Sequence, residues 1–508
     1  MSQASVLTCL KEVFGFSTFR GDQEAVITTV LSGNSALLIM PTGMGKSLCF
    51  QLPARILSQE GRGLTLVISP LIALMKDQVD AAQAKGLRAA FINSSLSAEE
   101  RNARYRKLAA GRYEILYVTP ERFRIPEFRE ALLQSGRQSG RQGGWQNPVA
   151  LLAVDEAHCI SSWGHDFRLD YSRLGDIRAE IGNPVTLAVT ASATPLVQAD
   201  ILKQLSIGDA QIFNRGVRRE NLSLEVVDLH GMEQKVQAFV SYRHRFPGPA
   251  ICYFSLVQSL MKFSDQISRL GFSHLIYHGQ LGDRERKRSQ EQFLAKTENE
   301  ALILATPAFG LGIDKENVRL VMHAEIPGSL ESYYQEVGRA GRDGRQAKAA
   351  LFFEDDDVSI QKDFLDWASP DPGFVNAVYN LIERNPLRAR QEGFDYLRTQ
   401  MNFYNRRDFR VETAVGLLER WGAIEGRKPI EWKAISEPPQ EYLDQALYQT
   451  RRTGQLRKLH EMVAFAKLSP EADHELCRMT ELEKYFGFKD GKRCGICDLC
   501  LSHGVAHD

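Results

Sequence analysis

The sequence predicts an α/β protein in which two parallel-sheet lobes precede a mainly helical segment and a small metal-binding module. Short apolar runs alternate with amphipathic stretches from about residue 30 to about residue 350. A glycine-rich phosphate-binding pattern follows the first run, and four cysteines lie near the end of the chain. A chain of 508 residues is too long for one core, because domains usually hold about 100–200 residues.

The apolar runs are short and free of charge, which is typical of parallel strands buried on both faces. Amphipathic helices between the runs would connect one strand to the next. The runs are too numerous for one modest sheet, so we expect two lobes with a break within residues 210–222. Examples of the runs are Ala36–Met40, Leu64–Ser69, Ile115–Val118, Leu151–Val154, Thr186–Val189, Ala250–Phe254, Leu302–Ala305 and Leu320–His323.

Composition excludes some classes of protein. Lys+Arg and Asp+Glu both number 63, so the chain lacks a polybasic coat, although a local basic groove remains compatible with neutrality. No apolar run approaches the ~18–20 residues that span a bilayer, and residues 1–20 lack the apolar core of a signal peptide. We expect a cytoplasmic, nucleoid-associated protein without a membrane partner.

Residues 41–47 follow the first apolar run and match the P-loop pattern. The pattern begins one residue earlier with a glycine, and this chain has Met40 at that position. Glycines leave room for backbone N–H groups to surround phosphates. Lys46 can reach the β- and γ-phosphates, and the Ser47 hydroxyl can bind Mg²⁺. The residues predicted to bind the phosphates of ATP are Thr42, Gly43, Met44, Gly45, Lys46 and Ser47.

A pair of carboxylates, Asp155 and Glu156, ends the apolar run Leu151–Val154. Side chains at the carboxyl end of a parallel strand point into the crevice where α/β proteins bind ligands. Asp155 would hold Mg²⁺ through water, and Glu156 would orient and deprotonate the attacking water. Such a pair alone would suit a solvated turn, but its position about a hundred residues after a P-loop favours catalysis.

Residues before the P-loop are candidates for binding adenine. The Gln23 amide can both donate to and accept from the edge of the base. Phe16 and Arg20 can sandwich the base by stacking and by cation–π contact. We expect Phe14 and Phe19 in the core; for Phe16, a core position and adenine stacking both stay open.

The stretch from His158 to Arg168 follows the carboxylates directly and is rich in aromatic residues. Trp163 and Phe167 can stack on bases of a single strand, at ~1–3 kcal/mol each, and Arg168 can pair with phosphate. A loop joined to Glu156 is well placed to couple DNA occupancy to hydrolysis. The alternative is a packed turn in which Trp163 is buried.

The clustered cysteines have the spacing Cys477-x16-Cys494-x2-Cys497-x2-Cys500, which can place four thiolates around one tetrahedral Zn²⁺. No position remains for water, so the metal would be structural. An iron–sulfur cluster is the alternative, although the spacing matches neither ferredoxin pattern. The remaining cysteines, expected to be buried thiols, are Cys9, Cys49, Cys159 and Cys252.

The α/β pattern stops at Ser369–Gly373, and the following segment is mainly helical. Asp408–Ile424 predicts a helix that ends before Gly422 and leads into a small wing. A winged-helix DNA-binding element and a helical spacer packed on the second lobe are both compatible with this pattern.

With these motifs together, the chain resembles the RecQ helicases of superfamily two over roughly residues 10–360 and 450–500. The aromatic-rich loop and the string SYYQEVGRAGRDG are the most specific parts of the resemblance. It implies two RecA-like lobes that sandwich ATP, and it supports the zinc module. The matching stretches are Phe14–Gln23, Met40–Phe50, Ser69–Val79, Tyr117–Phe123, Ala153–Arg168, Ala188–Pro195, Leu304–Arg319, Ser329–Gly344 and the terminal cysteines.

The resemblance also implies roles for single residues. Gln335, Arg339 and Arg342 would reach the γ-phosphate from the second lobe and neutralise charge in the transition state. Thr190, Ser192 and Thr194 would link hydrolysis to lobe movement. The residues expected along the DNA, through contacts that carry no sequence information, are Asn93, Ser94, Thr119, Pro120, Arg122 and Thr306.

The function that follows is an ATP-dependent DNA helicase acting in recombination, repair or replication-fork processing on single-stranded and forked DNA. Its 3′-to-5′ direction rests on the resemblance alone, and we expect a monomer. The alternatives are a translocase that remodels branches without net unwinding and a non-catalytic nucleic-acid-binding scaffold.

The expected division is lobe one at 1–210, lobe two at 211–370, the helical insert at 371–450 and the zinc module at 451–508. The resemblance implies a short form that ends after the zinc module, without the winged-helix and helical nucleic-acid-binding domains that often follow it.

Overall fold

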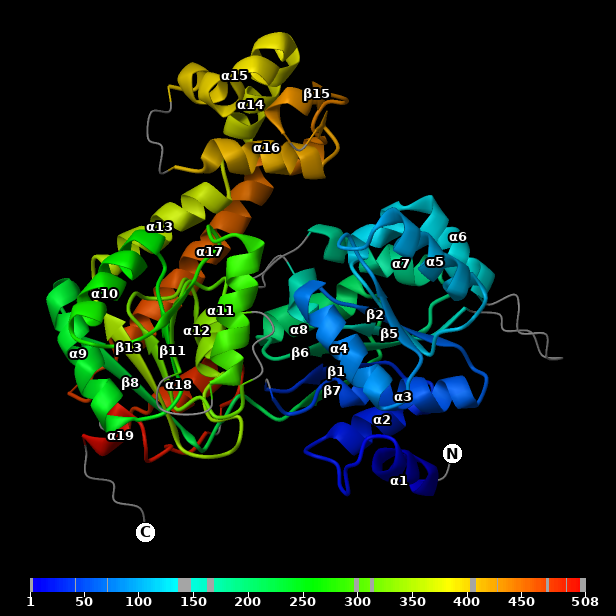
Figure 1. Cartoon of the computed structure of the whole chain (residues 1–508), viewed down its shortest axis with the longest axis horizontal. Helices are drawn as coiled ribbons and strands as arrows, with labels where there is room; N and C mark the ends of the chain where they lie inside the picture. The colour runs from blue at the N-terminus through cyan, green and yellow to red at the C-terminus, as the bar shows by residue number, and fades with distance from the viewer. Residues whose placement is uncertain are drawn as a thin grey trace. The chain divides into compact units, whose positions relative to one another are not determined.

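The computed structural model of the chain describes residues 3–41, 43–70, 72–135, 148–161, 169–296, 301–310, 315–402, 408–426, 428–471, 475–489 and 491–502. The chain forms two compact units. The first comprises Met1–Ala324, Glu331–Phe352 and Leu468–Asp508, and the second comprises Glu325–Leu330 and Phe353–Lys467. The first unit contains both large sheets and the cysteine cluster, and the second is mainly helical (Figure 1).

The first lobe is built on a seven-stranded sheet with the order β3-β4-β2-β5-β6-β1-β7, and its strand pairs are parallel. The strands are β1 (Ala36–Ile39), β2 (Leu64–Ile68), β3 (Ala89–Ile92), β4 (Ile115–Val118), β5 (Val149–Val154), β6 (Val185–Thr190) and β7 (Gln211–Asn214). The helices are α1 (Gln3–Glu12), α2 (Gln23–Leu31), α3 (Leu48–Gln59), α4 (Ile72–Ala84), α5 (Ala98–Ala109), α6 (Pro126–Ser135), α7 (Leu174–Glu180) and α8 (Pro195–Gln204). Short 3₁₀ helices are η1 (Pro120–Arg124), η2 (Ala157–Ile160) and η3 (Leu169–Arg173).

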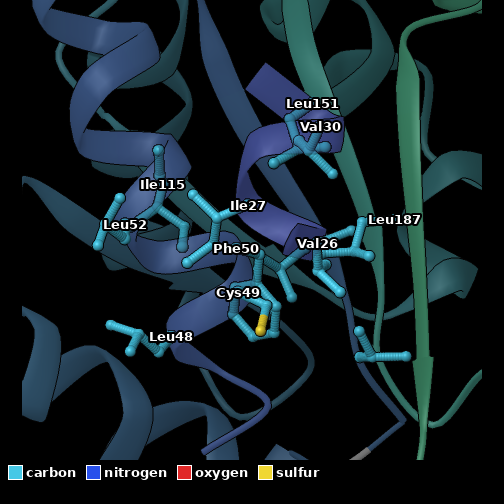
Figure 2. Close-up of a cluster of buried hydrophobic side chains, with 14 of the residues drawn as sticks. Val26, Ile27, Val30, Leu48, Cys49, Phe50, Leu52, Ile115, Leu151 and Leu187 are labelled. Atoms are coloured by element: carbon cyan, nitrogen blue, oxygen red, sulfur yellow. The ribbon is translucent and has the colours of Figure 1, made fainter. Parts of the chain in front are cut away.

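Two hydrophobic clusters cover the two faces of this sheet. In the cluster drawn in Figure 2, Val26 and Ile27 of α2 lie against Phe50 of α3 and beside strand residues such as Leu187. Burying each large apolar side chain contributes about 1.5–3 kcal/mol. This packing holds α3 against the sheet and so positions the loop that joins β1 to α3.

The second lobe has a six-stranded sheet with the order β10-β11-β9-β12-β13-β8, in which the pairs from β10 to β13 are parallel. Its strands are β8 (Leu222–Asp228), β9 (Ala250–Tyr253), β10 (Leu275–Tyr277), β11 (Leu302–Ala305), β12 (Leu320–His323) and β13 (Ala347–Phe353). Its helices are α9 (Gly231–Arg245), α10 (Val257–Arg269), α11 (Asp283–Ala295) and α12 (Leu330–Val337). The later helices α18 (Arg478–Tyr485) and α19 (Asp498–Leu501) belong to the same unit and pack against β8.

The second unit contains α13 (Asp357–Ala368), α14 (Pro372–Arg384), α15 (Pro386–Gln400), α16 (Arg410–Arg420), β14 (Ile424–Glu425), η4 (Pro429–Glu431), β15 (Lys433–Ala434), η5 (Gln440–Tyr442) and α17 (Gln445–Ala466). Strands β14 and β15 pair antiparallel after α16, and Gly422 between them and α16 has φ +72°. A separate core surrounds the buried Trp432. The predicted helix is therefore followed by two short paired strands, and α14 and α15 pack against α16.

The predicted α/β class with a helical segment is confirmed, and the expected strands are found within a few residues. The expected limits differ in two places. Strand β7 pairs with β1, so the first sheet extends past residue 210. Helix α17 lies in the second unit, so the cysteine module begins after it rather than at residue 451. Among the described residues, no helix combines the length and apolar character needed to cross a membrane.

Gly175 of α7 lies against the end of α8, so a substitution there tests how these two helices pack. A Cβ atom added to Gly175 would lie 2.2 Å from the backbone oxygen of Gln204. Because a backbone atom cannot rotate away, we expect Gly175→Ala to destabilise the first lobe by about 1–3 kcal/mol. Urea unfolding measures this as an earlier midpoint. Gly208→Ala is the matched control, since a Cβ there meets nothing within 4 Å; equal midpoints for the two variants would contradict the packing.

Candidate active site and metal centre

The loop between β1 and α3 has the backbone that a phosphate cradle requires. Gly43 and Gly45 have φ of +82° and +81°, a region that favours glycine. A Cβ on Gly45 would lie 2.7 Å from Gln23 Nε2, and one on Gly43 would lie 3.1 Å from Arg342 Cγ. Helix α3 follows, and its first backbone N–H groups donate to loop carbonyls, Leu48 N to Gly45 at 3.2 Å and Cys49 N to Lys46 at 3.0 Å. Both glycines are therefore required by conformation and by close neighbours.

Gln23 holds this loop in place. Its Oε1 accepts from the backbone N of Arg20 at 2.9 Å, and its Nε2 donates to the carbonyls of Met44 and Gly45 at 3.0 and 3.1 Å. The residue is 3% exposed. Both amide hydrogens are used, so Gln23 supports the loop in this structure instead of presenting its donors to adenine.

The other predicted adenine residues remain accessible. Phe16 is 46% exposed, and Arg20 is also exposed. Phe14 is buried and Phe19 packs against the core, as predicted. Of the two interpretations of Phe16, the core position is therefore wrong, and stacking on a base stays a prediction.

Three charged side chains meet at the carboxyl edge of the first sheet. Lys46 Nζ donates to the carbonyl of Met40 at 3.2 Å. Burial lowers the pKa of Lys46, while the charges of Glu156 and Asp155 oppose this effect. Burial raises the pKa of Asp155 to about 7; the charge of Glu156 adds to the increase and Lys46 opposes it. A buried acid that resists ionisation, with a second carboxylate beside it, forms a site that a divalent cation would stabilise.

Glu156 adopts the left-handed conformation, with φ +49° and ψ +48°. This conformation costs roughly 1–2 kcal/mol in a residue other than glycine. Its buried Oε2 accepts no hydrogen bond from the described residues and lies 3.4 Å from His158 Nδ1. A strained, incompletely paired carboxylate beside a phosphate loop is typical of a functional site.

His158 connects this glutamate to the end of β6. Its Nδ1 lies 2.9 Å from Thr190 Oγ1, and Thr190 donates its own proton to the carbonyl of Ser192 at 3.1 Å. Since the threonine proton is committed, His158 Nδ1 must be the donor to Thr190. The sequence did not predict this contact, because residue type alone does not identify a histidine's partner.

The arginines of the second lobe take two different positions. The aliphatic part of Arg342 approaches Gly43 of the phosphate loop. Arg339 is 7% exposed, and its Nη2 would lie 3.3 Å from a Cβ on Gly310 of the same lobe. Gln335 is partly buried on α12. The structure thus brings Arg342, but not Arg339, to the loop.

The residues predicted along the DNA have different surroundings. Ser94 is exposed after β3, and Arg122 is partly exposed in η1 after β4, so both lie at the carboxyl edge of the sheet. Asn93 is fully buried, and its Oδ1 accepts from Ser95 N at 3.0 Å and from Ser95 Oγ at 2.6 Å. The Asn93 amide therefore stabilises its own turn in this structure, and a contact of this residue with DNA stays a prediction. The predicted site residues Trp163, Phe167, Arg168 and Thr42 lie outside the described residues.

The four clustered cysteines converge. Their sulfur atoms all lie within 4.8 Å of one another, with Cys497 Sγ 3.9 Å from Cys477 Sγ and Cys494 Sγ 4.0 Å from Cys500 Sγ. A tetrahedral zinc with Zn–S bonds of about 2.3 Å separates its sulfurs by about 3.8 Å. A disulfide would need about 2 Å. A multi-iron cluster would separate the ligands further, so the cysteines fit a single metal ion best.

Backbone and side-chain contacts attach this module to the second lobe. Ser223 Oγ of β8 donates to the carbonyl of Ile496 at 2.6 Å, and Val226 N donates to Asp498 Oδ2 at 3.0 Å. Asp498 also accepts from the buried Arg478 at 2.7 and 2.8 Å. Arg218, in the segment between β7 and β8, donates to the carbonyl of Lys492. The sequence did not predict this attachment.

A P-loop lobe with an Asp-Glu pair, joined to a second parallel-sheet lobe that brings an arginine to the P-loop, defines a two-lobed helicase-type nucleotide hydrolase. The DEAD/DEAH box helicase model matches residues 20–201, and the helicase conserved C-terminal domain model matches residues 229–344. The chain shares its fold with Saccharomyces cerevisiae Dbp5 bound to RNA and ADP BeF3, with a TM-score of 0.54 and 16% identity over 70% of this chain and 90% of that one.

Sequence relatives are more specific. The chain is 39% identical to the ATP-dependent DNA helicase RecQ of Haemophilus influenzae over 72% of this chain and 56% of that protein. It is 34% identical to the probable ATP-dependent DNA helicase RecS of Bacillus subtilis over 76% of this chain and 75% of that protein. The chain belongs to the RecQ family of ATP-dependent DNA helicases. It spans little more than half the length of the Haemophilus relative.

The cysteine geometry predicts a bound metal. We expect about one equivalent of zinc in the purified protein by inductively coupled plasma mass spectrometry. Cys497→Ala should lose the zinc and lower the unfolding temperature, because it removes a fully buried ligand. Cys9→Ala, at a buried cysteine of the first lobe, should retain the zinc. Equal zinc content in the two variants, or iron in place of zinc, would contradict the assignment.

Proposed function

We propose that the chain hydrolyses ATP and uses the free energy to separate DNA strands in recombination, repair or fork processing. The observation that carries the proposal is the meeting of Lys46, Asp155 and Glu156 beside the P-loop, with Arg342 against Gly43. These groups supply phosphate binding, metal binding, water activation and charge neutralisation in one place.

Each residue has a role in this proposal. Lys46 binds the β- and γ-phosphates, Ser47 and Asp155 hold Mg²⁺, and Phe16 and Arg20 contact adenine. The magnesium ion, when bound, neutralises phosphate charge.

Glu156 accepts a proton from the attacking water, since its Oε2 is buried and available. His158 donates its Nδ1 proton to Thr190, and the same nitrogen lies 3.4 Å from Glu156 Oε2. Gln335, Arg339 and Arg342 contact the γ-phosphate when the lobes close.

DNA binding is supported by the carboxyl edges of the sheets and by the names of the relatives, which are called DNA helicases. Ser94 and Arg122 would contact phosphates, while Trp163, Phe167 and Arg168 would contact bases and phosphates of a single strand. The 3′-to-5′ direction follows the family. The cysteine module would hold Zn²⁺ and stabilise the second lobe.

A translocase that moves on DNA without separating strands is the second candidate. The charge pattern around α16 favours this candidate, because basic side chains there are paired with acids. Arg410 contacts Asp408 at 2.8 Å, and Arg398 contacts Glu412 at 2.6 Å. Paired arginines are less available to DNA phosphates, so the DNA-binding and spacer interpretations of this segment both stay open.

Hydrolysis depends on Glu156 in this mechanism. Glu156→Gln should lower DNA-stimulated phosphate release by roughly 10²–10⁴-fold, because the amide cannot accept the proton of water. Fluorescence anisotropy should show unchanged binding of single-stranded DNA. Glu180→Gln, at an exposed residue that pairs with Arg129, should retain full activity. Unchanged hydrolysis in Glu156→Gln would refute this role and favour a non-catalytic scaffold.

Strand separation is tested with 3′-tailed, 5′-tailed, forked and blunt duplexes in the presence of ATP. The helicase proposal predicts strand release from the 3′-tailed and forked duplexes and none from the others, because a 3′ single strand is needed for loading. DNA-stimulated hydrolysis without strand release on any substrate would replace the helicase with the translocase.

A further inference from the structure

One peptide group of the cysteine module is hydrogen-bonded at both of its ends. This peptide joins Ile496 to Cys497, in the turn between two of the clustered cysteines. Its carbonyl accepts from Ser223 Oγ of β8 at 2.6 Å, and its N–H donates to Cys494 Sγ at 3.3 Å. The peptide is trans, so these two groups point in opposite directions from one rigid plane. A hydroxyl of the second lobe therefore fixes the direction of a donor to a candidate metal ligand.

The Ser223 hydroxyl is itself held by a buried lysine. Lys348 Nζ of β13 donates to Ser223 Oγ at 3.1 Å and lies 2.5 Å from Glu225 Oε2. The Lys348 side chain is 7% exposed, and the ion pair with Glu225 offsets part of the cost of burying its charge. Because an ammonium can only donate, the single proton of the serine hydroxyl goes to the Ile496 carbonyl. The direction of each hydrogen bond from Lys348 to the peptide is thus determined.

The charge of the metal site explains why this direction matters. Four thiolates carry more negative charge than one Zn²⁺ neutralises, and N–H groups that donate to sulfur stabilise the excess. Hydrogen bonds in a chain polarise one another, so a peptide N–H donates more strongly when its own carbonyl accepts from a group bonded to a cation. The Cys497 N–H is such a donor, since its peptide carbonyl is connected through Ser223 to Lys348.

A second set of contacts holds the same turn beside β8. Val226 N donates to Asp498 Oδ2 at 3.0 Å, and Asp498 follows Cys497 directly. Arg478, at the start of α18, donates to the same carboxylate at 2.7 and 2.8 Å. The turn therefore has an attachment to β8 that does not involve Ser223. Removing the Ser223 hydroxyl would mainly release the direction of the peptide.

We propose that Ser223 and Lys348 are positioning residues for the metal, which direct the Ile496–Cys497 peptide at the Cys494 thiolate and so slow the loss of Zn²⁺ from the module. The inference rests on the part of the proposed function in which the cysteine module holds Zn²⁺. It adds two residues of the second lobe's sheet, distant in the chain from the cysteines, that determine how tightly the metal is held.

Ser223→Ala tests this connection because it removes one oxygen and leaves all four cysteines in place. With zinc-loaded protein and an excess of a chromogenic chelator, zinc should leave about tenfold faster, since losing a residue that orients a metal ligand typically weakens binding by about 10–100-fold. Ser223→Thr keeps the hydroxyl and should release zinc within about twofold of the unchanged protein. An unaltered rate in Ser223→Ala, or equally fast release in both variants, would overturn the proposal.

Ser264→Ala is the matched control. Ser264 is a buried serine of α10, and its Oγ lies 2.7 Å from His274 Nε2, so this hydrogen bond joins two parts of the second lobe. The variant should keep the original rate of zinc release even if its unfolding temperature falls. Release as fast as in Ser223→Ala would mean that a general loss of stability frees the metal, which contradicts a specific role for Ser223.

Cobalt substitution measures the donation to sulfur directly. A hydrogen bond to a thiolate stabilises its lone pairs and so raises the energy of the sulfur-to-cobalt charge-transfer band. In Co²⁺-loaded Ser223→Ala this band should move to longer wavelength, whereas Ser264→Ala should keep the band of the unchanged protein. A role of Ser223 in packing alone would leave the band where it is, and that result would refute the proposal.

Lys348→Met removes the charge and keeps most of the length of the side chain. It should also speed zinc release, and adding Ser223→Ala should change the rate by less than about a further twofold, because the two residues act in one chain. Lys315→Met should keep the original rate, since Lys315 Nζ donates to the carbonyls of Leu294 and Lys296 at 3.3 and 2.5 Å. Independent, additive effects of Lys348→Met and Ser223→Ala would exclude the connection through Ser223.

The zinc content of the unchanged protein separates failure of the inference from failure of the proposed function. If the purified protein holds no zinc, the metal assignment fails first, and the inference fails with it. If it holds zinc, and Ser223→Ala releases that zinc at the same rate with an unmoved cobalt band, only the inference is refuted.

Discussion

The candidate site depends on one constraint, the parallel direction of the strands in the first sheet. Because the strands pair parallel, the residues after β1, β5 and β6 all emerge at one edge, although they are distant in the chain. Lys46, Asp155 and Glu156 meet there, where burial lowers the pKa of Lys46 and raises that of Asp155. Water would screen these effects in an open loop. The buried cores on both faces keep the edge rigid enough for the charges to stay together.

Short polar chains lead away from this edge, and each has few members. Glu156 lies beside His158, which donates to Thr190, whose hydroxyl reaches Ser192. In the second lobe the Tyr253 hydroxyl donates to the carbonyl of Phe309 at 3.0 Å. Buried polar contacts of this kind have few alternative partners, so a change at one end must change the geometry at the other. The chain from Glu156 to Thr190 connects a group proposed for nucleotide chemistry with a residue expected to link hydrolysis to lobe movement.

The strands and the chemistry of the motifs could be predicted from the sequence, but the partners of single side chains could not. Uninterrupted apolar runs such as Leu302–Ala305 are found as strands, whereas the residues of β8 and β10 are mostly only partly buried, so burial marks these strands less clearly. Gln23 and Asn93 show the second limit. An amide predicts hydrogen bonding, yet only the folded chain shows that its partners are the P-loop carbonyls or Ser95. Glycines are better predicted, because their positive φ is required by the loop itself.

The cysteine module has a place in this arrangement that its spacing does not reveal. Phe486 of the module lies 5.4 Å from Tyr334 of α12, between ring centroids, and α12 precedes the arginines. Arg218, in the segment that joins the two sheets, reaches Lys492 and lies 3.5 Å from Glu483. A metal held by four cysteines stabilises a module too small to have a large core of its own. Its binding energy would therefore also restrain α12, which precedes the arginines, and the segment between the two sheets.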